Sequence, residues 1–238
     1  MITGIGKARR DTKLRTRPNE GEPWRPIALQ MQKHGWPGRL VTIDGIDGSG
    51  KSTLLREIAR QLEALGGRMI QTKTPSDDVR NMLLWRAWHD HTLGIPQSEI
   101  HEFGLTVISL GDKLLHQRRV IQKHLMAGDW VVSDRYILSS LAFESGVVHE
   151  AIGNLHIQPD LAFVVDVDPE VGMRRVRERG GEVEHPDDAR VARETRERLL
   201  LLARANPLNL HVTDTTDKTP EQTFQDCLPH LQALHTRA

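Results

Sequence analysis

The chain has 238 residues, and its 32 Lys and Arg side chains balance 32 Asp and Glu side chains, so the whole-chain charge does not predict a polyanionic partner. A single cysteine, Cys227, excludes an internal disulfide and is typical of a reducing cytoplasm. No apolar run approaches the roughly 20 residues that span a bilayer. These observations predict a soluble cytoplasmic protein without a membrane partner.

Residues 1–38 differ in composition from the rest of the chain. Residues 1–40 contain nine Lys and Arg against three Asp and Glu, and no apolar period in this stretch would bury a face. We therefore expect a basic extension, flexible up to at least Pro26, that is separate from a domain over residues 39–238. Two interpretations of the extension are open: a solvated tail without a role, and a basic arm that contacts nucleic acid or a partner protein.

From Arg39 onward, short apolar runs alternate with helical patterns. Several runs are apolar throughout, as expected of parallel strands covered on both faces, and they predict strands over residues 39–44, 68–72, 129–134, 161–167 and 209–214. The intervening patterns predict helices over residues 52–65, 76–89, 98–127, 137–145, 169–180, 187–205 and 220–235. This alternation predicts an α/β fold in which a parallel five-stranded sheet carries helices on both faces.

A glycine-rich turn lies between the first predicted strand and helix. Residues 45–52, GIDGSGKS, match the phosphate-loop pattern G-x-x-x-x-G-K-[ST] in that context. The glycines let backbone N–H groups turn toward an anion, and the helix N-terminus adds its positive dipole end. Lys51 would reach the β- and γ-phosphates, and the Ser52 hydroxyl would ligate Mg²⁺. The pattern predicts that Mg-ATP is bound by Gly45, Ile46, Asp47, Gly48, Ser49, Gly50, Lys51, Ser52 and Thr53.

Asp134 and Arg135 end the third predicted strand, at the sheet edge where open α/β sheets bind ligands. The carboxylate can hold Mg²⁺ directly or through water, and the guanidinium can bind a second phosphate with two hydrogen bonds. A plain salt-bridge pair is the alternative for Asp134 and Arg135. The sequence lacks the N-K-x-D pattern of guanine binding and an apolar strand ending in D-E. Phosphoryl transfer to a small acceptor is therefore favoured over a GTPase or a motor ATPase.

Three segments together resemble the thymidylate kinases, within the nucleoside monophosphate kinases. IDGIDGSGKST (residues 43–53) is similar to the family loop E-G-x-D-G-x-G-K-T/S-T. VVSDRYILSSLAFESG (131–146) is similar to V-x-S-D-R-Y-x-x-S-S-x-A-Y-Q-G, and PDLAFVVDVDPEVGMRRVRERG (159–180) to P-D-L-x-x-x-L-D-V-D-P-E-x-G-x-x-R-x-x-x-R-G. The resemblance covers about residues 40–231. It implies a P-loop NTPase fold with a lid segment, and phosphoryl transfer from Mg-ATP to a nucleoside monophosphate.

The resemblance also implies roles for individual residues. The implied catalytic residues are Lys51, Asp134, Arg135 and the lid arginines Arg175 and Arg179, for which a solvated helix face is the alternative. Asp47 would meet the 3′-hydroxyl of the acceptor or its phosphate through Mg²⁺, Phe143 would crowd out a 2′-hydroxyl, and Ser140 and Glu144 would face the base edge. The implied acceptor-binding residues are Asp47, Pro75, Ser109, Lys113, Arg135, Ser140, Phe143 and Glu144.

Three departures from the family pattern concern the acceptor and the lid. Residues 72–76 read TKTPS where the family has T-R-E-P-G-G, and the lid sequence GEVEHPDD contains no arginine. Ser109 stands where a phenylalanine stacks on thymine, and Lys113 where an arginine binds the base. We expect dTMP as the acceptor, with another nucleotide, a nucleoside or a small molecule as the alternative. An inactive nucleotide-binding regulator is a further alternative, and we also expect a homodimer.

Overall fold

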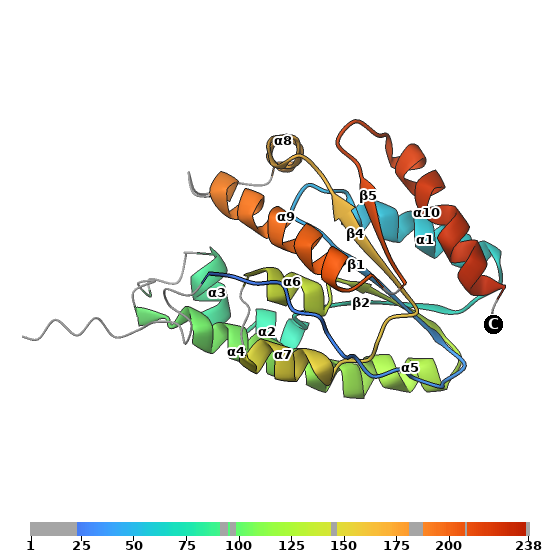
Figure 1. Ribbon diagram of the computed structural model, residues 1–238, viewed down its shortest axis with the longest axis horizontal. Coiled ribbons are helices and arrows are strands. Elements are labelled where there is room, and N and C mark those ends of the chain that lie inside the picture. The colour runs from blue at the N-terminus through green and yellow to red at the C-terminus, as the bar shows by residue number, and fades with distance from the viewer. Residues whose placement is uncertain are drawn as a thin grey trace, which may run out of the picture.

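Five strands form one parallel sheet in the order β2-β3-β1-β4-β5 (Figure 1). In this computed structural model, the described residues are 23–90, 95, 99–143, 147–180, 188–207 and 209–236. The strands are β1 (Arg39–Asp44), β2 (Met69–Lys73), β3 (Trp130–Asp134), β4 (Leu161–Asp166) and β5 (Leu210–Asp214). The predicted α/β class and parallel five-stranded sheet are confirmed.

The helices cover both faces of the sheet (Figure 1). They are α1 (Lys51–Ala64), α2 (Asp77–Arg80), α3 (Leu83–Asp90), α4 (Glu102–His116), the π-helix η2 (Gln117–Ile121), α5 (Gln122–Met126), α6 (Ile137–Phe143), α7 (Val147–Asn154), α8 (Pro169–Glu178), α9 (Asp188–Ala205) and α10 (Pro220–His235). Within the described part of the chain, none of these helices is both long enough and apolar enough to cross a bilayer.

Alternate strand residues divide the core into two main clusters. Leu40 and Val131 pack in a cluster that includes side chains of α4, α5, α6 and α9. Their neighbours Val41 and Val132 point to the opposite face, where they pack with side chains of α1 and α10. The inner strands β1, β3 and β4 are therefore buried on both faces, which explains why their sequences are largely apolar rather than alternating. The edge strands β2 and β5 are more exposed and more polar.

The helical predictions were correct in type but not in every boundary. The helix predicted over residues 76–89 is two helices, because the chain turns at Asn81 and Met82 between α2 and α3. The helix predicted over residues 98–127 begins at Glu102 and passes through the π-helix η2 before α5. The eight-residue helix α7 was not predicted. It is short, and Gly153 near its end weakens the helical signal.

Residues 23–36, which we call the N-terminal strap, pack on the domain. Five partly buried apolar side chains of the strap contact the α6–α9 side of the core: Trp24, Ile27, Leu29, Met31 and Trp36. Backbone N–H groups of Leu29 and Gln30 donate to the side chains of Asn206 (2.8 Å) and Asn154 (2.7 Å). The expectation that this segment adds nothing to the core is therefore wrong from Trp24 onward. Residues 1–22 lie outside the described residues, so the basic-arm hypothesis stays a prediction.

Removing the strap is expected to destabilise the domain. Compared with a chain that begins at residue 23, a chain that begins at residue 38 loses five packed apolar side chains, which corresponds to several kcal/mol of apolar burial. For a domain of this size we expect the melting temperature to fall by about 10 °C or more. Thermal unfolding of the two truncated proteins checks this result, and melting temperatures within about 2 °C of each other would contradict it.

Candidate active site

The phosphate loop connects β1 to α1, in the context that the sequence motif requires. Gly48 and Gly50 have φ angles of 76° and 95°, in the left-handed region that favours glycine. A Cβ atom on Gly48 would lie 2.0 Å from the carbonyl oxygen of Gly172 in α8. The loop therefore needs glycine at position 48 both for its backbone conformation and for the close approach of α8.

Lys51 is the first residue of α1, and it is only 7% exposed. Its Nζ donates to the carbonyl oxygen of Ile46 (2.7 Å) and lies 3.8 Å from Oδ1 of Asp47. Burial, followed by the positive charge of Arg135, lowers the pKa of Lys51 to about 7, although nearby carboxylates oppose the shift. The loop thus holds a desolvated ammonium group that an anionic ligand would stabilise.

Asp134 ends β3 beside the phosphate loop, because β1 and β3 are adjacent and Ile43 pairs with Asp134. Oδ1 of Asp134 is buried and has no hydrogen-bond partner among the described residues. An unpartnered buried carboxylate oxygen is unusual and is a ready ligand for a cation. Ser52 is exposed at the start of α1, as a metal-binding hydroxyl would need to be.

Arg135 lies over the phosphate loop. Its Nη1 donates to the carbonyl oxygen of Gly45 (2.9 Å), and its Nη2 donates to Oδ1 of Asp47 (2.5 Å). Partial desolvation raises the pKa of Asp47, but the charges of Arg135 and Lys51 help to lower it by more, and the net shift is downward. The structure therefore brings together Lys51, Asp47 and Arg135, three of the residues that the sequence predicted for this site.

The backbone of Arg135 is held in a conformation that is rare for a residue other than glycine. Its φ angle is 68°. Its carbonyl oxygen accepts hydrogen bonds from Oγ of Ser133 (2.8 Å) and Oγ1 of Thr74 (3.0 Å). Thr74 in turn accepts from Nζ of Lys113 (2.9 Å), which is 2% exposed and whose pKa burial lowers to about 8. A buried lysine on α4 thus supports the Arg135 backbone through Thr74.

The structure describes four of the other five predicted acceptor residues. Ser109 is buried on α4, Pro75 is half-buried and forms a cis peptide bond with Thr74, and Ser140 is half-buried on α6. Phe143 is the last residue of α6, and Glu144 lies outside the described residues. Contacts of these five residues with a base or sugar stay predictions.

Asp44 is a site residue that the sequence analysis missed. One carboxylate oxygen accepts from the backbone N–H groups of Tyr136 (3.1 Å) and Ser139 (3.0 Å), and also from the Ser139 hydroxyl. Asp44 therefore caps the N-terminus of α6 from the end of β1. An acidic residue at the end of a buried strand was the available signal, but its partner lies 92 positions away in the sequence.

Of the two predicted lid arginines, Arg175 is half-buried and hydrogen-bonded to Thr215, whereas Arg179 is exposed. Arg175 donates to the hydroxyl of Thr215 (3.1 Å) and to its carbonyl oxygen (2.7 Å) in the loop after β5. Thr215 Oγ1 donates to the carbonyl oxygen of Ser49 (2.9 Å). Nε of Arg179 donates to the Arg175 carbonyl oxygen (3.0 Å). Residues 181–187 of the lid lie outside the described residues, so phosphate binding by both arginines stays a prediction.

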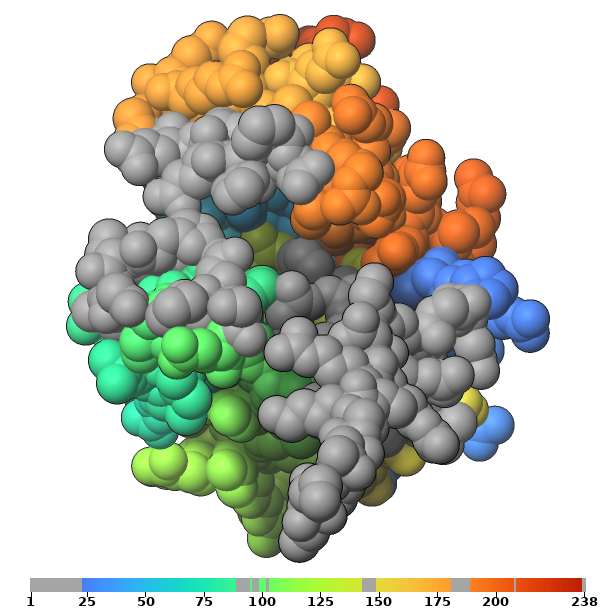
Figure 2. Space-filling model, turned by 90° about the vertical axis from the view of Figure 1, so that its left-hand side faces the viewer, coloured from blue at the N-terminus to red at the C-terminus, as the bar shows by residue number. Residues whose placement is uncertain are grey.

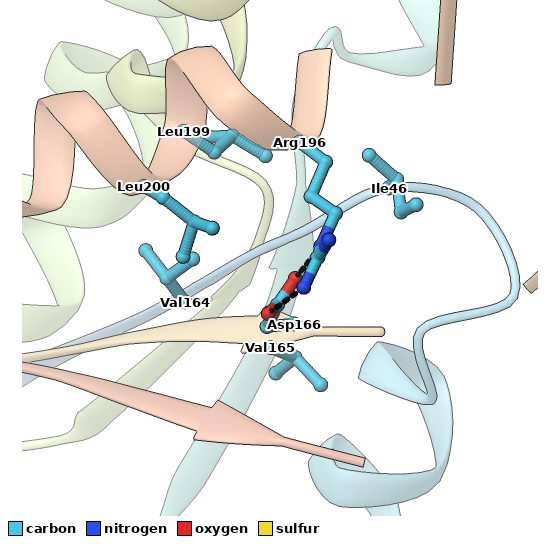
Figure 3. Close-up of a pocket in the computed structure, with 7 residues that line it drawn as sticks. All are labelled: Ile46, Val164, Val165, Asp166, Arg196, Leu199 and Leu200. Carbon is cyan, nitrogen blue, oxygen red and sulfur yellow. Dashed lines mark hydrogen bonds and ion pairs between the residues drawn. The ribbon is translucent and has the colours of Figure 1, made fainter. Parts of the chain in front are cut away.

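A second arginine–carboxylate contact fixes α9 behind the loop. Arg196 donates from Nε and Nη2 to the two oxygens of Asp166 (2.6 and 2.8 Å), as Figure 3 shows. This bidentate pair lines a small pocket together with Ile46, Val164, Val165, Leu199 and Leu200. Asp166 is the last residue of β4. Through its ion pair with Arg196, it also anchors α9, the helix that follows the lid.

Residues with different places in the sequence therefore meet at the carboxyl edge of the sheet. Figure 2 views the molecule from the side toward which the strands point in Figure 1, and its surface is hollowed between the α8–α9 part of the chain and α4. Within the described ranges, no group of three or more His, Cys, Asp and Glu side chains could hold a metal. This finding is compatible with Mg²⁺, which is held in kinases by one or two protein groups together with substrate phosphates.

Comparisons with known proteins agree with this arrangement. The family model of thymidylate kinase matches residues 43–226. The thymidylate kinase of Carboxydothermus hydrogenoformans is 32% identical over 219 residues, which cover 83% of this chain and 98% of that protein. The thymidylate kinase of Methylococcus capsulatus is 30% identical over 189 residues, which cover 75% and 88%.

A solved structure has the same fold. The crystal structure of thymidylate kinase from Ehrlichia chaffeensis superposes with a TM-score of 0.58 and covers 82% of this chain and 98% of that chain, at 21% sequence identity. The family match covers well over half of the sequence, and it contains the phosphate loop, the Asp134–Arg135 pair and the segment of Arg175 and Arg179. By its sequence and its fold, the chain belongs to the thymidylate kinase family.

Proposed function

We propose that this protein transfers the terminal phosphoryl group of ATP to dTMP. The observation that carries the proposal is the convergence of a buried lysine, an unpartnered carboxylate oxygen and an arginine at one sheet edge: Lys51, Asp134 and Arg135. Phosphoryl transfer depends on positioning and on neutralising negative charge rather than on a strong base, and these groups supply both. The names of the relatives give thymidylate as the acceptor.

On the donor side, the loop amides and Lys51 would bind the phosphates of ATP. Ser52 and Asp134 would hold Mg²⁺, which supplies neutralisation of the phosphate oxygens when it is bound. Lys51 would exchange its hydrogen bond to the Ile46 carbonyl oxygen for one to a phosphate oxygen. Its low pKa in the free protein reflects the absence of such an anion, because desolvation is the largest contribution to the shift.

On the acceptor side, Arg135 would bind the phosphate of the nucleotide and Asp47 its 3′-hydroxyl. The two side chains form an ion pair over the loop, which supports a role for both beside the transferred group. Phe143 would lie against the sugar. Arg175 on α8 and Arg179 directly after that helix would neutralise charge as the lid closes and excludes water.

ATP binding is expected to take up a proton above neutral pH. At about pH 8, a lysine with a pKa of about 7 is mostly neutral, and bound phosphates would raise that pKa and protonate it. At about pH 6, Lys51 is already charged and would contribute no uptake. Calorimetric titration in buffers of different ionisation enthalpy measures the proton count, with Lys51→Met as the control that removes the Lys51 contribution. Equal uptake by the two proteins at pH 8 would contradict the assignment.

A second acceptor is favoured by one specific observation. Ser109 stands where the family has an aromatic ring that stacks on thymine, and the Lys113 ammonium already donates to Thr74. Another nucleoside monophosphate is therefore the second candidate. A coupled ADP-release assay across a panel of nucleoside monophosphates, nucleosides and simple phosphates tests the choice. The proposal expects the highest kcat/KM for dTMP, and a clear preference for another acceptor would replace dTMP in the proposal.

If Ser109 and Lys113 line the base pocket, Ser109→Phe with Lys113→Arg should raise kcat/KM for dTMP relative to the other acceptors. A ring stack contributes roughly 0.5–1.5 kcal/mol and a charged hydrogen bond roughly 1.5–3 kcal/mol. These terms allow a gain of about ten- to a thousandfold, if the buried site accepts the ring. The melting temperature of the variant checks for overpacking, because Ser109 is buried. An unchanged acceptor ranking in a stable variant would place both residues outside the pocket.

We also infer a homodimer, formed through the exposed side of α4. Val107, Ile108 and Leu115 are 39%, 36% and 65% exposed. Gly111 lies between them, with open space where its Cβ would be. Their spacing places them on one side of the helix, where a second copy of α4 could approach closely. Analytical ultracentrifugation of the wild-type protein and of the Leu115→Glu variant measures their mass in solution. The inference requires a dimer for the wild type and a monomer for the variant.

A cytoplasmic location is the remaining part of the proposal. Cys227 is unpaired and buried on α10. Burial raises the pKa of its thiol to about 12, so the thiolate is scarcely populated at neutral pH. A free thiol suits a reducing compartment.

A further inference from the structure

We propose that the N-terminal strap positions the acceptor site by capping the C-terminus of α6, with Trp24 as the positioning residue. The proposal rests on the proposed function, because it assigns the acceptor to α6. The strap begins ahead of residue 43, where the family match starts. It is therefore a feature of this chain that the match does not cover.

Helix α6 needs support at both ends because it has only seven residues. Its last four carbonyl groups have no partner within the helix. Nε1 of Trp24 donates to the carbonyl oxygen of Leu141 (3.0 Å), and Nη1 of Arg198 donates to that of Ala142 (3.2 Å). Asp44 caps the opposite end. The strap and α9 thus supply hydrogen-bond donors to the C-terminus of α6. Asp44, at the end of β1, supplies the acceptor at its N-terminus.

Trp24 and Arg198 also support each other. The Arg198 guanidinium lies 5.6 Å from the centre of the Trp24 ring, within cation–π distance. Trp24 is partly buried against the same apolar cluster that contains Leu141 and Ala142. Loss of the indole ring would therefore remove one cap of α6 and weaken the placement of the second.

The position of α6 links this cap to the acceptor rather than to ATP. Only Tyr136 separates Arg135 from the first residue of α6, and the last turn of the helix carries Ser140 and Phe143. The donor loop instead leads into α1, which packs on the other face of the sheet. A displaced α6 should therefore weaken acceptor binding while ATP binding stays unchanged.

Trp36 provides a matched control near the amino ends of the strands, whereas α6 follows the carboxyl end of β3. It packs against the same cluster and stacks on His34 with 5.5 Å between ring centres. His34 Nε2 contacts Oδ2 of Asp160 (2.9 Å), which also accepts from the backbone N–H of Leu40 at the start of β1. Trp36 therefore supports the amino ends of the strands, away from α6.

Steady-state kinetics and thermal unfolding of the full chain test the proposal with Trp24→Phe, Trp24→Ala and Trp36→Ala. We expect Trp24→Phe, which keeps a ring and loses the N–H donor, to raise the dTMP KM about fivefold, the factor for one neutral hydrogen bond. Trp24→Ala should raise it further, with the ATP KM unchanged. Trp36→Ala should lower the melting temperature and leave the dTMP KM unchanged. If both alanine variants alter the dTMP KM equally, or neither does, the strap does not position the acceptor site.

Hydrogen exchange of the α6 amides gives a second readout that does not need activity. Trp24→Ala should speed exchange at α6 more than Trp36→Ala does, and equal exchange in the two variants would overturn the proposal. A wild-type protein that transfers phosphate to no acceptor would count against the proposed function alone. In that case the exchange experiment still decides whether Trp24 holds α6.

Discussion

Lys51→Ala is expected to lower kcat by about a thousandfold, the upper range for loss of one preorganised electrostatic partner. Lys51 is the buried cation at the start of α1, and in the free protein its Nζ is held on the Ile46 carbonyl oxygen beside Asp47. Alanine leaves the glycine backbone in place, so ATP should still bind, with lower affinity. Steady-state kcat and the ATP Kd of the purified variant measure the two effects.

The same variant should not lose stability. Burial of the Lys51 ammonium is unfavourable, as its lowered pKa indicates, so its removal should leave the melting temperature unchanged or raise it. Lys123→Ala, an exposed change on α5, serves as the control for a lost lysine. Near-normal turnover in Lys51→Ala would contradict the assignment of the phosphate loop.

Asp134→Asn is expected to lower kcat at least about a hundredfold while ATP affinity changes little. Asparagine has nearly the same shape, but it loses the negative charge that the buried, unpartnered Oδ1 would offer to Mg²⁺. The loss should be partly recovered at high Mg²⁺ concentration if the change weakens metal binding. Turnover and ATP binding measured across a Mg²⁺ titration check this expectation.

Asp129→Asn is the matched control, because Asp129 precedes the same strand at its other end. There it pairs with His124 (2.7 Å) and Arg68 (3.6 Å), away from the loop. We expect this variant to lose stability but to keep its turnover. Equal losses of rate and ATP affinity in Asp134→Asn would instead mean that Asp134 only supports the local structure.

The fold could be predicted from sequence because its main signals are local. The inner strands β1, β3 and β4 are short, largely apolar runs, and β1 was predicted with its observed bounds. The strap was not predicted. Ile27, Leu29 and Met31 alternate as in a strand, but only over five residues, and Trp24 and Trp36 do not continue that spacing. In a segment that lies on a surface, the positions of the apolar residues depend on the shape of that surface. Here the surface is formed by residues far along the chain.

The candidate site divides in the same way. The phosphate loop is contiguous, so its residues and its strand-loop-helix context could be predicted together. The contacts of Asp44 with Tyr136 and Ser139 join positions that are 92 and 95 residues apart. The contact of Lys113 with Thr74 joins positions that are 39 residues apart. No pattern in the sequence indicates these contacts. Lys113 was predicted to reach the base, whereas its ammonium is seen on Thr74. Its contact with a base stays a prediction that the Ser109 and Lys113 variants test.

Separation of the nucleotides after incubation of the protein with ATP, Mg²⁺ and dTMP tests the central claim most directly. Phosphoryl transfer to dTMP predicts that dTDP forms in an amount equal to the ADP released, and that both products form about a thousandfold more slowly with Lys51→Ala. ADP released without dTDP, or no turnover by a folded wild-type protein, would contradict the claim.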